Sequence, residues 1–205
     1  YLIYMENKKP HLINNTQNNR DVIGFNDSLL SMSSFNEWPA DMITVFIVQK
    51  SAIKSQSTMA IVDPGSDRFF NLHVPWSSSV IYWDYGRTGS SYGRLDESIT
   101  SGGTSFSVND YYLYEFSYGN SSSQNNASNN QTYMEIKKNA IVLDYGSRSV
   151  TIPSDINTTG AGYILNIGDD DSSSDRSFEG NIAEIIIFDK DLNSEETAEV
   201  NRYLS

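Results

Sequence analysis

The sequence of 205 residues contains no cysteine and only two histidines, His11 and His73. The absence of cysteine excludes disulfides, thiolate zinc sites and a cysteine nucleophile. With two histidines, a histidine-rich metal site is excluded as well, and serine–histidine catalysis would depend on one of these two residues. We interpret His73 as a packing residue, because it lies inside an apolar stretch and no base partner is evident for it.

Positive charge is also scarce, since 14 Lys and Arg residues oppose 26 Asp and Glu residues and leave a formal net charge of −12. This balance argues against nucleic acid and against anionic membrane surfaces as partners. No run approaches the roughly 18 apolar residues of a membrane-spanning helix, so we expect no membrane insertion. The chain starts at Tyr1 without a charged-then-apolar leader, which predicts a processed product or a piece of a longer protein.

The chain instead carries many short apolar runs separated by Gly, Ser, Asn and Asp. Residues 42–48 are rich in β-branched residues and apolar on both faces, as in a central strand. Residues 69–74 and 80–85 flank a turn and predict two paired strands, and residues 133–137 and 140–144 predict a hairpin around Lys138-Asn139. The alternation over 111–118 places four aromatic residues on one face. The pattern predicts an all-β antiparallel β-sandwich that occupies residues 1–205 as a single domain.

One short helix is predicted at the C-terminal end, after the apolar run at 182–188. Asn193 is a suitable N-cap, and Glu196 stands three residues later, as in a capping box. Val200, Tyr203 and Leu204 then form one apolar edge. A helix this short is not stable alone, so we expect that edge to dock on the sheet.

The segment FEGNIAEIIIF at 178–188, followed by Leu192, SEE at 194–196 and NRYL at 201–204, resembles the C-terminal signature of laminin-G-like, concanavalin A-like lectin/glucanase jelly-roll domains. MEIKKN at 134–139 resembles a hairpin of the same family, in which Lys-Asn-Gly is usual, although Ala140 replaces the glycine. Residues 21–26 and 28–32 resemble its entry strands. The resemblance implies a jelly roll but no particular ligand, because the matched residues are core and turn residues.

Members of this family that cleave glycans carry three acids on one strand, as E-x-D-x-x-E. No glutamate of this chain starts that pattern, and the adjacent Asp96 and Glu97 would point to opposite faces of a strand. Glycoside hydrolysis requires two carboxylates that flank the bond. We therefore predict that the protein is not an enzyme, while a pair of acids from different strands stays open as a less favoured alternative.

An acidic stretch follows the predicted strand at 163–167 and offers four carboxylates and several hydroxyls, the hard oxygen ligands that Ca²⁺ prefers. The resemblance implies calcium at such a rim, and crowded like charges repel unless a cation joins them. The alternative is a solvated acidic loop. The candidate calcium ligands are Asp169, Asp170, Asp171 and Asp175.

A second group of candidates combines aromatic residues with Asp and Arg, the side chains that bind sugars by stacking on C–H faces and by bonding hydroxyls. We expect Trp76 to lie in a turn, and Arg87, Tyr92 and Arg94 in or beside a Gly/Ser-rich loop, where binding residues often occur. Of Tyr82 and Trp83, one must face the core. The predicted ligand-binding residues are Trp76, Asp84, Tyr85, Arg87, Tyr92 and Arg94.

These observations favour a non-catalytic recognition module that binds a glycan or a cell-surface partner. We expect an extracellular, cell-surface or virion-surface location. The alternative is a structural module that decorates a capsid or fibre and binds neighbouring subunits. A polysaccharide-active hydrolase or lyase is the third and least favoured interpretation.

Overall fold

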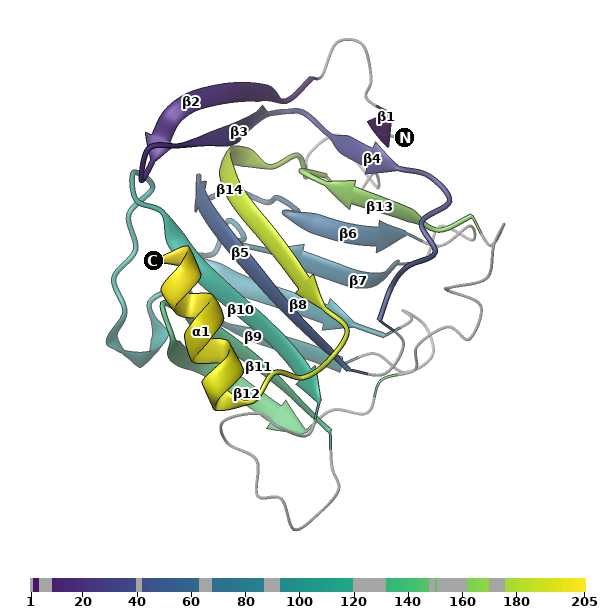
Figure 1. Ribbon diagram of the computed structural model, residues 1–205, viewed down its shortest axis with the longest axis vertical. Helices are drawn as coiled ribbons and strands as arrows, with labels where there is room; N and C mark the ends of the chain where they lie inside the picture. The colour runs from purple at the N-terminus through teal and green to yellow at the C-terminus, as the bar shows by residue number, and fades with distance from the viewer. Residues whose placement is uncertain are drawn as a thin grey trace.

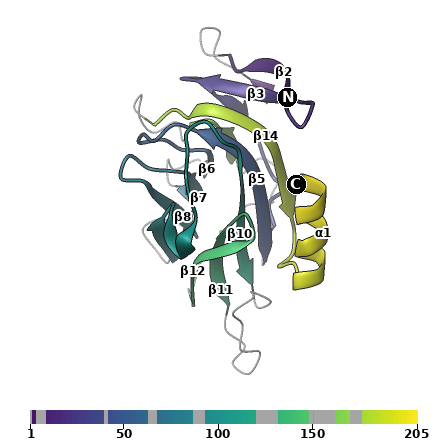
Figure 2. The same ribbon diagram turned by 90° about the vertical axis from the view of Figure 1, so that its left-hand side faces the viewer.

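The computed structural model describes residues 2–3, 9–39, 42–62, 68–86, 93–119, 132–147, 150, 162–169 and 176–205. Within these residues the strands form two antiparallel sheets of seven strands each, with one α-helix at the C-terminal end (Figures 1 and 2). This arrangement confirms the predicted antiparallel β-sandwich with a short C-terminal helix.

The two sheets are named sheet A and sheet B. Sheet A contains, in spatial order, β1 (Leu2–Ile3), β4 (Leu30–Met32), β13 (Ile164–Ile167), β6 (Met59–Val62), β7 (Arg68–His73), β8 (Val80–Tyr85) and β9 (Gly93–Ser98). Sheet B contains β12 (Ile141–Ser147), β11 (Tyr133–Lys138), β10 (Tyr112–Gly119), β5 (Ile43–Ser51), β14 (Glu179–Phe188), β3 (Arg20–Asn26) and β2 (His11–Gln17). A short 3-10 turn, η1 (Ser101–Gly103), and the helix α1 (Ser194–Leu204) complete the described elements.

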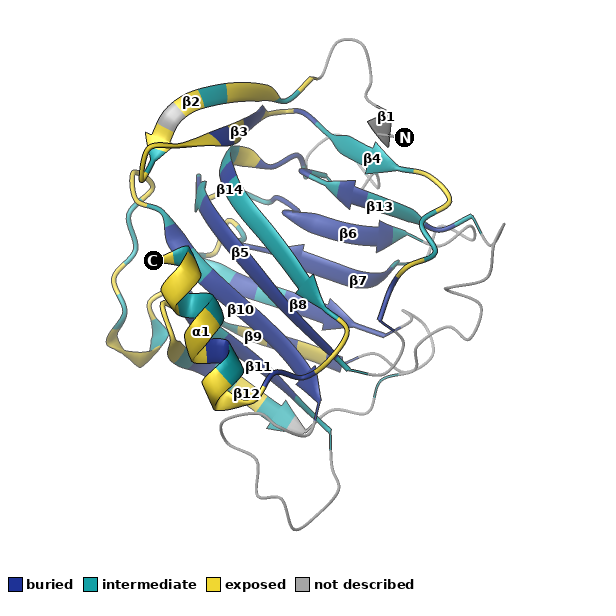
Figure 3. Ribbon diagram, viewed as in Figure 1, coloured by how far each residue is buried: buried dark blue, intermediate teal, exposed yellow. Residues whose placement is uncertain are grey.

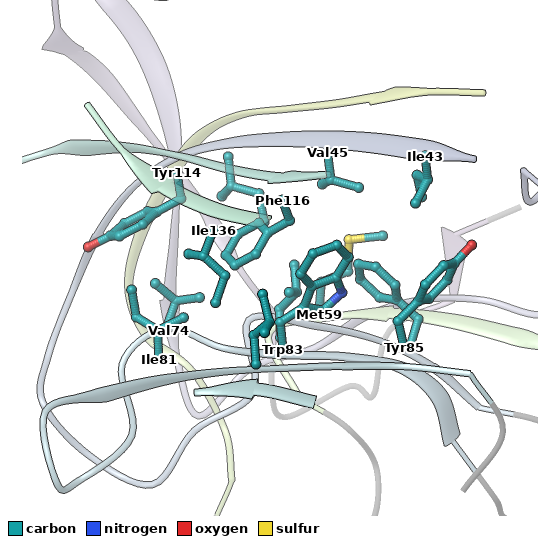
Figure 4. Packing of buried hydrophobic residues seen from close by; sticks show 14 of the residues in the cluster. Ile43, Val45, Met59, Val74, Ile81, Trp83, Tyr85, Tyr114, Phe116 and Ile136 are labelled. Atoms are coloured by element: carbon teal, nitrogen blue, oxygen red, sulfur yellow. The ribbon is translucent and has the colours of Figure 1, made fainter. Parts of the chain in front are cut away.

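The core lies between the two sheets, where alternate residues of each strand point inward. Ile43 and Val45 of β5 and Phe116 of β10 meet Trp83 and Tyr85 of β8, as Figure 4 shows. The aromatic alternation predicted for 111–118 is therefore the core face of β10. The central strands are buried, whereas β2 and α1 carry many exposed residues (Figure 3).

The predicted strand pairs are present, with one correction at the hairpin turn. β7 pairs with β8, and β11 pairs with β12. The turn between β11 and β12 is formed by Asn139 and Ala140 rather than by Lys138 and Asn139, with φ values of 48° and 64°. Two left-handed residues match the twist of a tight hairpin, and Ala140 occupies the position where the resemblance expects glycine.

The helix α1 begins as predicted and contacts sheet B. The Asn193 side chain accepts hydrogen bonds from the amides of Glu195 and Glu196, and the Glu196 side chain completes the capping box. Thr197 is the buried residue of this helix, and Tyr203 is 53% exposed. Tyr203 contacts sheet B as predicted, because its hydroxyl donates to Glu184 on β14 and the Arg20 guanidinium of β3 lies 5.0 Å from its ring centroid. None of the described helices has the length and apolarity needed to span a membrane.

Candidate functional site

The candidate site lies on the outer face of sheet A, the face turned away from sheet B. Leu72 and Trp83 point into the core, so the alternate residues of β7 and β8 point outward. Across the strands, Asn71 pairs with Asp84, and Asp84 pairs with Arg94 of β9. The strand register therefore forms a row of polar side chains on this face.

A pocket of about 380 Å³ occupies this region and is called the outer pocket here. It is lined by Arg68, Phe70, Asn71, His73, Trp76, Tyr82, Asp84, Arg94 and Arg176. Its volume falls in the range of small-ligand sites, about 300–1,000 Å³.

Three rings form an aromatic wall in the outer pocket. The ring centroids of His73 and Trp76 are 4.6 Å apart, and those of Trp76 and Tyr82 are 6.3 Å apart, both in edge-to-face geometry. Trp76 lies in the turn between β7 and β8, where its amide donates to the Val80 carbonyl at 2.7 Å. The indole is thus held at the rim in a half-exposed position.

A chain of buried hydrogen bonds holds His73 in one orientation. Its Nδ1 lies 2.7 Å from the carbonyl oxygen of Gln56, and because a carbonyl only accepts, Nδ1 carries the hydrogen. Its Nε2 then accepts from the side-chain amide of Asn71 at 3.1 Å, and Asn71 in turn accepts from the Ser57 hydroxyl at 2.8 Å. His73 is packed, as the sequence predicted, and it also forms part of the outer pocket.

Charged groups complete the lining. Arg94 donates from Nε and Nη2 to the two oxygens of Asp84 at 2.5 and 2.7 Å, a bidentate pair that fixes the guanidinium plane. The same guanidinium lies 5.3 Å from the centroid of the Tyr82 ring. Arg176 stacks in the same way over Trp76 at 5.6 Å. Both guanidinium groups are therefore oriented by ring faces.

The structure brings three of the six predicted ligand-binding residues together and corrects one. Trp76, Asp84 and Arg94 line the outer pocket, whereas Arg87 and Tyr92 lie outside the described residues. Tyr85 is fully buried between the sheets, where its ring packs against other aromatic residues of the core (Figure 4). Adjacent strand residues point to opposite faces, so Asp84 and Tyr85 cannot both face the pocket.

Several lining residues were missed by the sequence analysis. Tyr82 and Asp84 are two residues apart and share a face, and this alternation could have identified Tyr82. The register of the β7–β8 hairpin could have identified His73, which pairs with Tyr82. No local pattern marks Arg176, which reaches the site from the segment before β14, where its carbonyl accepts from the Ser57 amide at 2.8 Å.

Of the predicted calcium ligands, only Asp169 belongs to the described residues, and Asp170, Asp171 and Asp175 lie outside them. The Ser177 hydroxyl lies 2.6 Å from Asp27 and 3.0 Å from Asp169, which brings these two carboxylates together. Calcium takes six to eight oxygen ligands. Within the described part of the chain, no cluster of three acidic or histidine side chains fits a metal ion, so calcium stays a prediction.

The described lining of the outer pocket contains one carboxylate, whereas glycoside hydrolysis uses two. Among its described lining residues, Asp84 is the one carboxylate, and both of its oxygens are engaged by Arg94. A general acid or nucleophile would have to be accompanied by a second carboxylate across the bond. The arrangement is suited to holding a ligand by ring faces and fixed N–H groups.

Comparisons with known proteins show the fold. No family model matches the sequence, and no curated protein matches it either. Domain 4 of AbnA, an extracellular arabinanase from Geobacillus stearothermophilus, has a similar structure, with a TM-score of 0.64 and 13% identity over 94% of this chain and 81% of that one. The structure of that domain is a complex with arabinotriose.

The botulinum neurotoxin serotype D binding domain is similar with a TM-score of 0.62 and 12% identity, over 99% of this chain and 46% of that one. This chain thus spans less than half of the neurotoxin domain that it matches. The CBM40 of a Ruminococcus gnavus IT-sialidase has a TM-score of 0.56 and 13% identity over 80% and 84% of the two chains. At these identities the shared property is the jelly-roll β-sandwich, and the laminin-G-like assignment stays a prediction.

Proposed function

We propose that this domain is a non-catalytic recognition module that binds a glycan in the outer pocket of sheet A. The observation that carries the proposal is the wall of His73, Trp76 and Tyr82 beside the fixed Asp84–Arg94 pair. Aromatic faces bind the C–H faces of sugar rings, and a few oriented polar groups select the hydroxyls. The site is also rigid, because its strand residues are held by the core beneath them.

Structures with the same fold support this proposal by analogy. Domain 4 of AbnA was determined with arabinotriose, and the R. gnavus CBM40 with α2,3-sialyllactose. Fold alone does not fix function, so the weight of the argument rests on the side chains of the outer pocket. We place the domain in an extracellular or surface-exposed part of a longer protein, in keeping with this function.

A glycan array with the isolated domain, read in calcium and again in EDTA, tests the proposal. Trp76→Ala should weaken binding by about tenfold or more, the equivalent of about 1.4 kcal/mol. Tyr145→Ala is the matched control, because Tyr145 is 48% exposed but lies on β12 of the other sheet. The Tyr145→Ala variant should bind the glycan as tightly as the wild type does.

The outcomes separate the alternatives. Binding that is unaffected by Trp76→Ala would exclude the outer pocket as the site. Binding lost in EDTA would support calcium at the rim that contains Asp169. If no glycan on the array is bound in calcium or in EDTA, the result would favour the structural module that contacts neighbouring subunits.

A further inference from the structure

A second pocket, of about 320 Å³, lies between α1 and the face of sheet B that points away from sheet A, and is called the helix pocket here. Its lining comes from β2, β5, β10, the β11–β12 turn and α1, and includes Gln17, Val48, Leu113, Asn139, Asn201 and Leu204. Figure 2 shows α1 beside sheet B on the side opposite to sheet A, so the helix pocket and the outer pocket lie on opposite faces of the sandwich. The volume falls in the range of small-ligand sites.

The floor of the helix pocket is apolar. Val48 of β5 and Leu113 of β10 are direct partners in the strand register. Both side chains point away from the core, because Ile47 and Tyr112, which precede them, point into it. Leu204 of α1 lines the pocket as well. Together these residues offer an apolar surface that a C–H face of a ligand can cover.

An aromatic ring, that of Tyr111, also belongs to the lining. Its hydroxyl accepts a hydrogen bond from the side-chain amide of Asn181 at 3.0 Å, and the Lys50 ammonium lies 5.4 Å from its ring centroid. Asn181 is on β14 and Lys50 is on β5, so two neighbouring strands of sheet B hold the ring in place. The ring adds an aromatic surface beside the apolar floor.

Three side-chain amides complete this description of the lining. The Asn139 side-chain oxygen accepts from the Leu113 amide at 3.0 Å, which leaves the NH₂ group of Asn139 for a ligand. Within the described part of the chain, the half-buried Gln17 and Asn201 use their side-chain amides in no hydrogen bond. A primary amide has two N–H donors and an oxygen acceptor, so the helix pocket offers both kinds of group.

The chemistry of the helix pocket selects among ligand classes. Its described lining contains no charged side chain, so an ionic ligand would lose hydration without gaining a counter-charge from these residues. A purely apolar ligand would cover amides and leave them without partners. A neutral sugar avoids both costs, because it presents a C–H face together with hydroxyls that donate and accept.

We infer that the helix pocket binds a neutral sugar unit, whose C–H face packs on Leu113 and Tyr111 while its hydroxyls bond to the amides of Asn139 and Asn201. This site is separate from the outer pocket and goes beyond the proposed function. It requires no metal and no covalent step.

NMR titration of the ¹⁵N-labelled protein tests the inference, because the side-chain NH₂ signals of Asn139 and Asn201 report on the helix pocket directly. The probes are the methyl glycosides of glucose, galactose and mannose, and the methyl glycosides of the three matching uronic acids. At least one neutral glycoside should shift both side-chain signals. The matching uronic acid should bind there about fivefold or more weakly, because the described lining offers its carboxylate no cation.

Asn201→Leu should weaken the binding of that neutral glycoside by about fivefold or more, because it removes the amide but keeps a side chain of similar size. Leucine is a good helix former, so the variant should stay folded. Asn26→Leu is the matched control, because Asn26 is exposed at the end of β3 and lies outside the described lining of the helix pocket. This control and Trp76→Ala should both bind the glycoside at the helix pocket as tightly as the wild type does.

Failure of this inference can be told apart from failure of the proposed function. Shifts that are confined to the outer pocket and are lost in Trp76→Ala would overturn the helix pocket and keep the glycan site of sheet A. Binding at the helix pocket that is equally tight for the uronic acid, or that is unchanged in Asn201→Leu, would overturn the inference. The absence of any shift with all six probes would overturn it as well, whereas the glycan array would still decide the proposed function.

Discussion

A buried ion triad on sheet B provides the sharpest test of how this fold is stabilised. The Lys137 ammonium lies 2.9 Å from Glu115 and 2.8 Å from Glu135, and both carboxylates are almost completely buried. Glu135 and Lys137 face α1 across a small pocket that Thr197 also lines. Burial raises the pKa of Glu115, and this effect outweighs the attraction of Lys137. Burial disfavours the charge of Lys137, but the two carboxylates outweigh it and raise its pKa.

We predict that Lys137→Met lowers the free energy of unfolding by about 3–5 kcal/mol at about pH 7.5, because it leaves two buried carboxylates without their cation. The loss should shrink toward about pH 5. In the folded variant the pKa of Glu115 is raised further, so above its ordinary value of 4.5 the folded state binds more protons than the unfolded state. Stability therefore falls as pH rises through this range, by about 1.4 kcal/mol for each unit of pKa shift.

Urea denaturation at about pH 5, 6 and 7.5 measures both effects. Lys54→Met is the control, because Lys54 pairs with Glu179 at 3.5 Å on the surface and should contribute less than about 1 kcal/mol at each pH. Adding Glu115→Gln to Lys137→Met should recover part of the loss at the highest pH. The reasoning is refuted if Lys137→Met costs no more than Lys54→Met, or if its cost is the same at both ends of the pH range.

Two further predictions concern the turn and the core. Ala140→Gly should raise the free energy of unfolding by about 0.5–1 kcal/mol, because alanine at a φ of 64° is strained. The control Ala198→Gly, within α1, should lower it by about 1 kcal/mol. Urea denaturation measures both changes, and a lower stability of Ala140→Gly would show that the turn is not strained. Tyr85→Phe should leave glycan affinity unchanged, since the ring is fully buried, and weaker binding in titration calorimetry would contradict its place in the core.

The fold could be predicted from the sequence, because the patterns that indicate its strands and turns are local and recur along the chain. Apolar runs bounded by turn residues predicted β5, the pairing of β7 with β8 and the hairpin of β11 with β12. The capping box at Asn193 predicted the start of α1. The burial of Thr197 was harder to predict, because a short helix with few apolar residues can rotate on a sheet without violating any local pattern.

The candidate site could be predicted from the sequence only in part, because it depends on which face of each strand points into the core. Composition around residues 76–94 identified Trp76, Asp84 and Arg94, but Tyr85 was included through its proximity in sequence. A decision on the orientation of β8 would have exchanged Tyr85 for Tyr82. Arg176 could not be predicted for another reason. It contacts Trp76, which lies 100 positions earlier in the chain, and no sequence periodicity indicates such a contact.

This division between faces also bears on the proposed site, because the core face of β8 holds the strand that carries part of the outer pocket. Trp83 and Tyr85 fix the inner face of β8 against Phe116 and Tyr118 of sheet B, so the backbone that carries Tyr82 and Asp84 has little freedom to move. We expect a ligand at the proposed site to meet rings and guanidinium planes that are already oriented, so that less entropy is lost on binding. If the outer pocket is the binding site, as we propose, its specificity can change through the side chains of the outer face without any change in the core residues that determine the fold.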